Sequence, residues 1–214
     1  MKGYYINLDS RKDRKEHFEK NIKKHKIFSN ITRSSAIKHT RGDIGCGMSH
    51  LNILQKLKNE EGEYFLVCED DLIILSDNAL TKFEEYFEKI KDNKEWDLIL
   101  LTPFSAVSVN GDAELNENHF VRIVNAQTTT AYIVKKSFID LLIMNFDIAI
   151  KSMEKGGCNQ EFAIDMFWKK LQPQCNFYTF KYRFMGQLPG YSDIEKRIVN
   201  YNGWVMANPI VLTT

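Results

Sequence analysis

The chain has 214 residues, of which 43% are hydrophobic and 12% aromatic, and 29 Lys and Arg against 28 Asp and Glu leave a net charge of +1. This length is enough to bury a core without disulfides, and the aromatic content, with only 11 Gly and 4 Pro, excludes disordered and collagen-like chains. No apolar run approaches the roughly 20 residues of a membrane-spanning helix. Because signal-peptide and KDEL-type retention patterns are also lacking, we expect a single cytoplasmic domain over residues 1–214.

The charges and cysteines bear on the ligand and the compartment. Residues 1–50 carry a net charge of +7 and residues 51–120 carry −10. This asymmetry is suited to steering an anionic ligand toward a cation held by carboxylates, although solvated helix faces are the simpler explanation. The four Cys show no CxxC pair, which favours a reducing compartment.

Strands and helices alternate along the first hundred residues. Apolar β-rich runs predict strands at 3–8, 28–37, 63–68 and 96–101. Capping residues and helical spacing of apolar residues predict helices over 10–26, over 48–57 after a loop punctuated by glycines, and over 80–90. Three such alternations predict an α/β domain with a mainly parallel central sheet flanked by helices.

The second half of the chain has a less regular pattern. Residues 103–118 are predicted to form a polar loop, a candidate lid or acceptor loop. Strands are expected over 120–124, 131–134 and 176–184, and helices over 138–150 and 161–171. No internal repeat is visible.

Three consecutive acids, Glu69, Asp70 and Asp71, follow the apolar strand predicted over 63–68. Ligands of open α/β sheets bind at the carboxyl ends of the strands. Adjacent carboxylates repel one another unless a cation neutralises them, and oxygen ligands suit Mg²⁺ or Mn²⁺. If the backbone stays extended, Glu69 and Asp71 point the same way and share the ion. An acidic turn that ends the strand remains the alternative.

Two further segments combine features of phosphate binding. Gly45 to His50 lie at a predicted helix start, whose free N–H groups favour anions; Cys46 and His50 share a helix face with Ser49 beside them. A hydrogen-bonded structural His is the alternative there. In the segment Asn7–Arg14, Arg11 and Arg14 are suited to bind a phosphate or stack on a base, or simply to form a salt-bridged helix start.

A general base is predicted on the helix expected over 161–171. Glu161 and Asp165 lie four residues apart on a predicted helix beside Trp168, although surface acids would show the same spacing. Beyond them, the turn-rich segment 187–194 is a candidate to fold over a site.

The order of these motifs along residues 4–194 resembles the family 25 glycosyltransferases, which include lipooligosaccharide and collagen hydroxylysine galactosyltransferases. The matching elements are YINLD with Arg11 and Arg14, GDIGC with Ser49-His50, CEDD, WDLILL, TTTAY, AID, and Gln187 with SDI. The pairing of GC..SH with EDD is the specific part. Because the sequence is shorter than that of many members, we expect no added domain, which leaves the acceptor open.

The resemblance implies a GT-A-type nucleotide-binding domain in which Glu69 and Asp71 hold Mn²⁺, or Mg²⁺, beneath the diphosphate of a UDP-sugar. It implies inverting transfer of a hexose, galactose, to a hydroxyl on a glycan or a hydroxylated protein, with Asp165 as base and Glu161 as second choice. The residues expected to bind the nucleotide sugar are Asn7, Leu8, Asp9, Arg11, Arg14, Gly45, Ser49, His50, Asp70, Thr129, Gln187, Ser192 and Asp193.

Other functions remain open at this point. A metal-dependent phosphohydrolase or nucleotidyltransferase also uses clustered carboxylates, but such sites gather acids from several strand ends, and Asp97 begins its strand. A non-catalytic nucleotide-sugar-binding module is a second alternative. Nucleic-acid binding by the basic segment 11–26 is disfavoured because few aromatic residues are interleaved for base stacking.

Overall fold

The computed structural model describes residues 1–201. The strands are β1 (Gly3–Asn7), β2 (Ile31–Ser35), β3 (Tyr64–Glu69), β4 (Leu72–Ile74), β5 (Leu98–Leu100), β6 (Val107–Val109), β7 (Phe120–Val124), β8 (Ala131–Lys135), β9 (Phe177–Phe180), β10 (Met185–Gln187), β11 (Gly190–Ser192) and β12 (Arg197–Val199). The helices are α1 (Lys12–Asn21), α2 (Gly42–Leu57), α3 (Asp77–Ile90), α4 (Ala113–Glu117), α5 (Ile139–Glu154), α6 (Asn159–Phe162) and α7 (Ile164–Phe167). Single 3₁₀ turns lie at Lys26–Phe28, Lys136–Phe138 and Trp168–Lys170.

One large sheet organises the described residues, with strand order β2-β1-β3-β8-β5-β9-β7-β6. Strand β1 pairs in parallel with β2 and β3, and β5 pairs in parallel with β9. Only β7 and β8 run against the other strands of this sheet. The structure therefore confirms the predicted α/β domain, with a mainly parallel central sheet flanked by helices.

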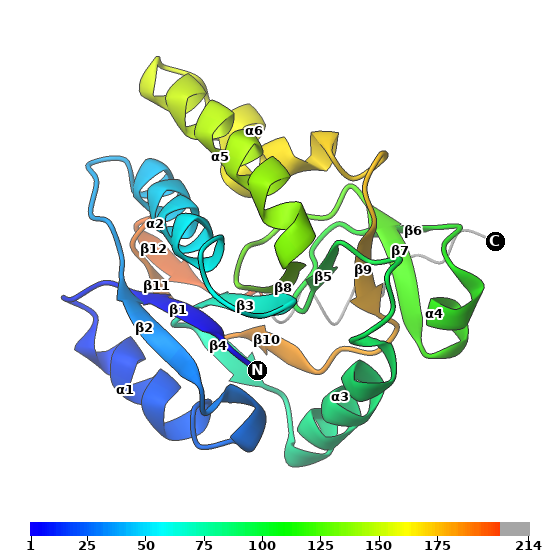
Figure 1. The fold of residues 1–214 in the computed structure, drawn as a ribbon. Helices are drawn as coiled ribbons and strands as arrows, with labels where there is room; N and C mark the ends of the chain where they lie inside the picture. The colour runs from blue at the N-terminus through cyan, green and yellow to red at the C-terminus, as the bar shows by residue number, and fades with distance from the viewer. Residues whose placement is uncertain (202–214) are drawn as a thin grey trace.

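Helices cover both faces of the sheet (Figure 1). Phe65 and Val67 of β3 pack into the core beneath α2 and α5, while Leu66 and Cys68 pack into the opposite core, beneath α1 and α3. Successive side chains of a strand point to opposite faces, so a strand buried on both faces must be apolar at every position. Each fully buried apolar side chain contributes roughly 1.5–3 kcal/mol, which makes β3 a rigid support for the acids that follow it.

The structure corrects several predicted elements. Helix α2 begins at Gly42, so the glycines at 45 and 47 lie inside the helix and not in a preceding loop. Residues 103–118 contain β6 and α4: the Asp112 side chain accepts a hydrogen bond from the Leu115 N–H and caps α4, and buried Leu115 anchors it. The helix predicted over 161–171 is broken at Ala163, whose ψ is 141°.

Two small sheets lie outside the main one and were not predicted. Strand β10 pairs with β4, directly after the acids of β3, and β11 pairs with β12 as a hairpin. Within residues 1–201, none of the helices combines the length and apolar character needed to cross a membrane.

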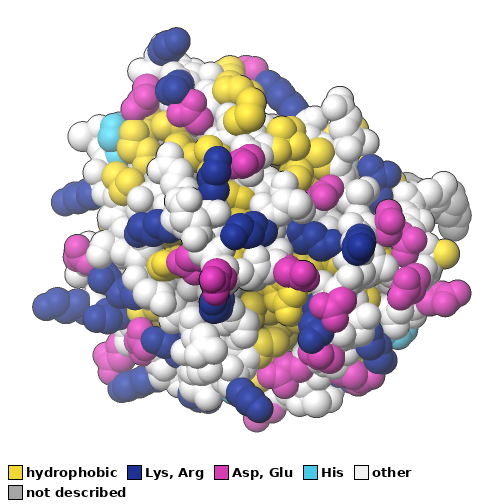
Figure 2. Space-filling view, in the orientation of Figure 1, with side chains coloured by type: hydrophobic (Ala, Val, Ile, Leu, Met, Phe, Trp, Pro, Cys, Tyr) yellow, Lys and Arg dark blue, Asp and Glu magenta, His cyan; other side chains and the backbone are white. Residues whose placement is uncertain are grey.

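The surface carries interspersed charges of both signs (Figure 2). Acidic side chains predominate over α3 and α4, at the lower right of this view, which corresponds to the acidic middle of the sequence. Apolar side chains gather over α5, where Leu141, Met144 and Ile148 are exposed.

A test of this packing is the substitution Gly45→Ala. A Cβ at Gly45 would lie 2.6 Å from the Ile37 carbonyl oxygen, a backbone atom that cannot move away without shifting the 36–39 loop. Overpacking of this kind costs about 1–3 kcal/mol, so we expect the melting temperature to fall by about 3–10 °C. Gly190→Ala is the control, because nothing lies within 4 Å of its Cβ position. Equal melting temperatures for the two variants would contradict the predicted clash.

Candidate functional site

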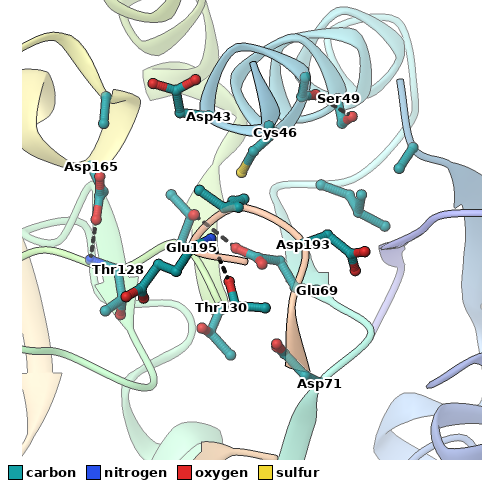
Figure 3. A pocket seen from close by; sticks show the side chains of 18 of the residues that line it. Asp43, Cys46, Ser49, Glu69, Asp71, Thr128, Thr130, Asp165, Asp193 and Glu195 are labelled. Carbon is teal, nitrogen blue, oxygen red and sulfur yellow. Dashed lines mark hydrogen bonds between the residues drawn. The ribbon is translucent and has the colours of Figure 1, made fainter. Parts of the chain in front are cut away.

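A cavity of about 1020 Å³ opens at the carboxyl ends of β1 and β3. It is bordered by the start of α2, the 127–130 segment, α7 and the β11–β12 hairpin. This is the edge at which ligands of open α/β sheets bind, and the volume is at the upper end of the range for small-molecule sites. Figure 3 shows side chains from these elements converging on one open space.

Glu69 ends β3 and projects into the cavity (Figure 3). Its Oε1 accepts a hydrogen bond of 2.8 Å from the Thr129 hydroxyl, and His50 Nε2 lies 3.6 Å from the same oxygen. Burial acts to raise the pKa of Glu69, but His50 and Thr129 outweigh it and hold the pKa below its usual value. Glu69 is therefore an anion at neutral pH.

Asp70 and Asp71 share the guanidinium of Arg14. Its Nη1 donates to Asp70 at 3.1 Å and to Asp71 at 2.9 Å. Asp70 also accepts a hydrogen bond of 2.6 Å from the Asn7 amide, and burial raises its pKa. Strand β3 ends at Glu69 and the backbone turns at residues 70–71, so the extended backbone on which the predicted alternation depended does not continue to Asp71.

Asp71 is the most constrained of the three acids. Its side chain is 3% exposed, and Oδ2 accepts hydrogen bonds from Arg14 and, at 3.0 Å, from the Gln187 amide. Its other oxygen, Oδ1, has no hydrogen-bond partner among the described residues. Burial, and next the charge of Glu69, raise the pKa of Asp71 to about 7.

The side chains of Glu69 and Asp71 fit a divalent cation. A buried carboxylate oxygen without a partner is a vacant ligand atom, and the repulsion between the two acids is the kind that a bound cation relieves. Oxygen ligands suit Mg²⁺ or Mn²⁺.

Asp165 stands across the cavity from the acids of β3 (Figure 3). It comes from α7, and its Oδ2 accepts a hydrogen bond of 3.1 Å from the Thr128 N–H. Thr128 has a φ of 85°, a left-handed conformation that costs a β-branched residue free energy and that clusters at functional sites. The Thr128 hydroxyl donates to the Thr102 carbonyl at 2.6 Å and holds this turn in place. Burial raises the pKa of Asp165.

Glu161 is not part of this arrangement. The break at Ala163 places it on α6, a different helix from Asp165, so the two acids do not share a helix face. Its side chain is 57% exposed, lies 3.8 Å from Lys170 and does not line the cavity.

The two predicted phosphate-binding arginines hold the β11–β12 hairpin. Arg11 Nη1 donates to Asp193 at 2.7 Å and to the Tyr191 carbonyl. Arg14 Nη2 donates to the same carbonyl at 2.9 Å. The hairpin is thereby fastened to the start of α1 beside the acids.

Most of the residues predicted for the site line the cavity. These are Leu8, Arg11, Arg14, Gly45, Ser49, Glu69, Asp70, Asp71, Thr129, Asp165, Gln187, Ser192 and Asp193. Ser49 also has a structural part, since its hydroxyl accepts from the Ile37 N–H and donates to the Gly45 carbonyl.

Three predicted nucleotide-binding residues lie outside the lining. Asn7 is buried and holds Asp70, Asp9 pairs with Arg33 on the outer surface, and His50 is fully buried behind Glu69. Conversely, sequence reasoning missed Thr128 and the lining cation Arg183. In the sequence, Thr128 is indicated only by its place in a run of three threonines, and Arg183 belongs to no recognisable motif.

A family model described as glycosyltransferase family 25 (LPS biosynthesis protein) matches residues 28–151. No curated protein matches the chain.

Several solved structures align with the chain. A glycosyltransferase involved in the glycosylation of the major capsid of PBCV-1 aligns with a TM-score of 0.58 at 10% identity, covering 96% of this chain and 98% of that one. A197 from STIV aligns with a TM-score of 0.45 at 9% identity and 93% coverage of both chains. CTP:phosphocholine cytidylyltransferase from Streptococcus pneumoniae aligns with a TM-score of 0.46 at 11% identity, covering 87% of this chain and 72% of that one. The first likeness extends over nearly the whole of both chains and shows a shared fold.

The raised pKa of Asp71 predicts that the difference in stability between Asp71→Asn and the parent protein depends on pH. Because its folded-state pKa is raised, the folded protein favours the protonated carboxyl, and this group destabilises the fold as the pH rises from about 4 to about 7. Asp71→Asn mimics the protonated form. Without added metal, we expect it to melt several degrees above the parent protein at pH 8, with a smaller difference at pH 5.

Thermal melts at the two pH values measure this difference. Asp147→Asn, on the surface of α5, is the control. Its melting temperature relative to the parent protein should be nearly the same at pH 5 and pH 8. A variant that melts below the parent protein at pH 8 would show instead that the ionised Asp71 stabilises the fold through Arg14.

Proposed function

Since the chain belongs to glycosyltransferase family 25 and is a glycosyltransferase, we propose that it transfers a hexose, galactose, from a UDP-sugar to a hydroxyl group with inversion at the anomeric carbon. The acceptor would be a glycan or a hydroxylated protein. The observation that carries the proposal is the placement of Glu69 and Asp71 on one side of a single cavity and of the buried carboxylate of Asp165 on the other.

The donor half of the site is formed by the ends of β1 and β3. Glu69 and Asp71 would hold Mn²⁺ or Mg²⁺, which supplies Lewis-acid stabilisation to the leaving diphosphate. Arg11 and Arg14 line the same side, where their guanidinium groups pair with acidic side chains and partly neutralise the negative charge that a diphosphate would meet. The volume of the cavity is sufficient for a nucleotide and its sugar.

The acceptor half is formed around Asp165. In the proposed reaction the acceptor hydroxyl transfers its proton to Asp165, its oxygen bonds to the anomeric carbon, and the bond from that carbon to UDP breaks. A base works best when its pKa is near the working pH, and burial moves the pKa of Asp165 in that direction. The Thr128 N–H fixes Oδ2 and leaves Oδ1 to accept the proton.

The position of Asp97 argues against a multi-carboxylate phosphohydrolase. Asp97 accepts a hydrogen bond from the Asn176 N–H at the start of β5 and does not line the cavity. The strand-end acids of the cavity thus come from β3, whereas two-metal sites usually gather acids from several strand ends.

The role of Asp165 is tested by Asp165→Asn. Loss of a general base lowers turnover by about 10²–10⁴-fold, so we expect this loss in acceptor-dependent UDP release at pH 7.5. Glu161→Gln is the matched control because Glu161 is exposed outside the cavity, and it should retain turnover within about twofold. A loss below about tenfold for Asp165→Asn would place the base elsewhere.

The metal and donor assignments are tested by a screen of nucleotide sugars with Mn²⁺, against glycan and peptide acceptors. We expect acceptor-dependent UDP release with UDP-galactose, loss of activity with EDTA, and at least about a 100-fold loss in Asp71→Ala. Full transfer by Asp71→Ala would refute the metal assignment. Release of inorganic phosphate with unmodified acceptors would identify a phosphohydrolase instead.

A further inference from the structure

A second group of ligand atoms adjoins the Glu69/Asp71 pair. One sulfur, nitrogen or oxygen ligand atom from each of Cys46, His50 and Glu69 lies within 4.8 Å of the other two. Cys46 and His50 are one turn apart on α2, so they share a helix face. In Figure 3 the Cys46 sulfur points from α2 toward Glu69. The cluster thus joins the two motifs, GC..SH and EDD, that lie apart in the sequence.

The His50 ring is held in a position suited to a metal ligand. The side chain is fully buried, and its Nε2 has no hydrogen-bond partner among residues 1–201. The 3.6 Å from Nε2 to Glu69 Oε1 is too long for a hydrogen bond. A buried polar atom without a partner costs roughly 1–3 kcal/mol, and a bound ion would remove this cost.

The other ring nitrogen has the outer partner that a metal-bound histidine needs. His50 Nδ1 lies 3.2 Å from the hydroxyl of Tyr132, which is itself fully buried. With Nε2 as the ligand, Nδ1 carries the proton and donates it to the Tyr132 oxygen. Such a hydrogen bond fixes the tautomer and the ring orientation at most metal-bound histidines.

The donor set selects a different class of ion from the oxygen pair. One thiolate, one imidazole and one carboxylate suit Zn²⁺, whereas Mg²⁺ and Mn²⁺ prefer oxygen alone. Cys46 and Glu69 both line the cavity, which gives an ion a path of entry. Three protein ligands with a fourth position left to water or substrate is the arrangement of non-structural zinc sites.

We propose that Cys46, His50 and Glu69 bind a thiophilic divalent ion of the Zn²⁺ class, with the fourth coordination position open to the cavity. On binding, the Cys46 thiol releases its proton to solvent and ligates as thiolate. The site goes beyond the proposed sugar transfer, because neither Cys46 nor His50 has a part in that reaction.

The experiment is a Co²⁺ titration of the metal-free protein followed by optical spectroscopy, since Co²⁺ reports on Zn²⁺ sites. Wild type should develop a near-ultraviolet thiolate-to-Co²⁺ band that saturates at one equivalent and disappears on addition of Zn²⁺. Cys46→Ser should abolish the band, and His50→Gln should weaken Co²⁺ binding at least about tenfold. Far-ultraviolet circular dichroism of both variants confirms that they are folded.

Two control variants separate this site from other sites in the chain. Cys158→Ser removes an exposed thiol, and Asp71→Asn removes a ligand that only the oxygen pair uses; both should keep the band. The proposal is overturned if wild type shows no band, if the band persists in Cys46→Ser, or if Asp71→Asn abolishes it. Because transfer activity is not measured, these outcomes do not depend on the proposed reaction.

Discussion

The ion pairs between Arg14 and the acids after β3 are the constraint on which the site depends. Burying several carboxylates at the end of a strand is costly unless a cation compensates them. Arg14 Nη1 contacts both Asp70 and Asp71, and its Nη2 holds the Tyr191 carbonyl of the β11–β12 hairpin. One guanidinium therefore joins the start of α1, the acids and the hairpin into a single structural unit.

The fold and the chemistry of the acids were largely predictable from sequence. The run from Tyr64 to Cys68 is apolar at nearly every position, and a strand buried on both faces gives that pattern. The acids that follow this strand lie at the carboxyl edge of the sheet, so the position of Glu69 and Asp71 beside the cavity could be predicted from local information.

The parts that could not be predicted depend on contacts between distant segments. The glycine at 45 signals a loop in the sequence, yet it allows α2 to approach the Ile37 carbonyl, a neighbour known only from the fold. Glu161 and Asp165 have ideal helical spacing, but the extended backbone of Ala163 separates them. Arg14 has the chemistry of a phosphate ligand, and its pairing with the acids appears only when α1 packs beside β3.

Glu69 belongs to both of the proposed metal-binding groups, and this gives α2 a direct effect on the donor half of the cavity. With Asp71 it forms an all-oxygen pair, and with Cys46 and His50 it forms a mixed sulfur, nitrogen and oxygen set. A site that combines nitrogen, oxygen and sulfur ligands generally binds Zn²⁺ more tightly than Mn²⁺. If both proposals hold, a Zn²⁺-class ion bound to Cys46 and His50 would use the Glu69 carboxylate, which the diphosphate-binding cation also needs. On these two proposals, both ions would use the Glu69 carboxylate, and the two sites would compete for it.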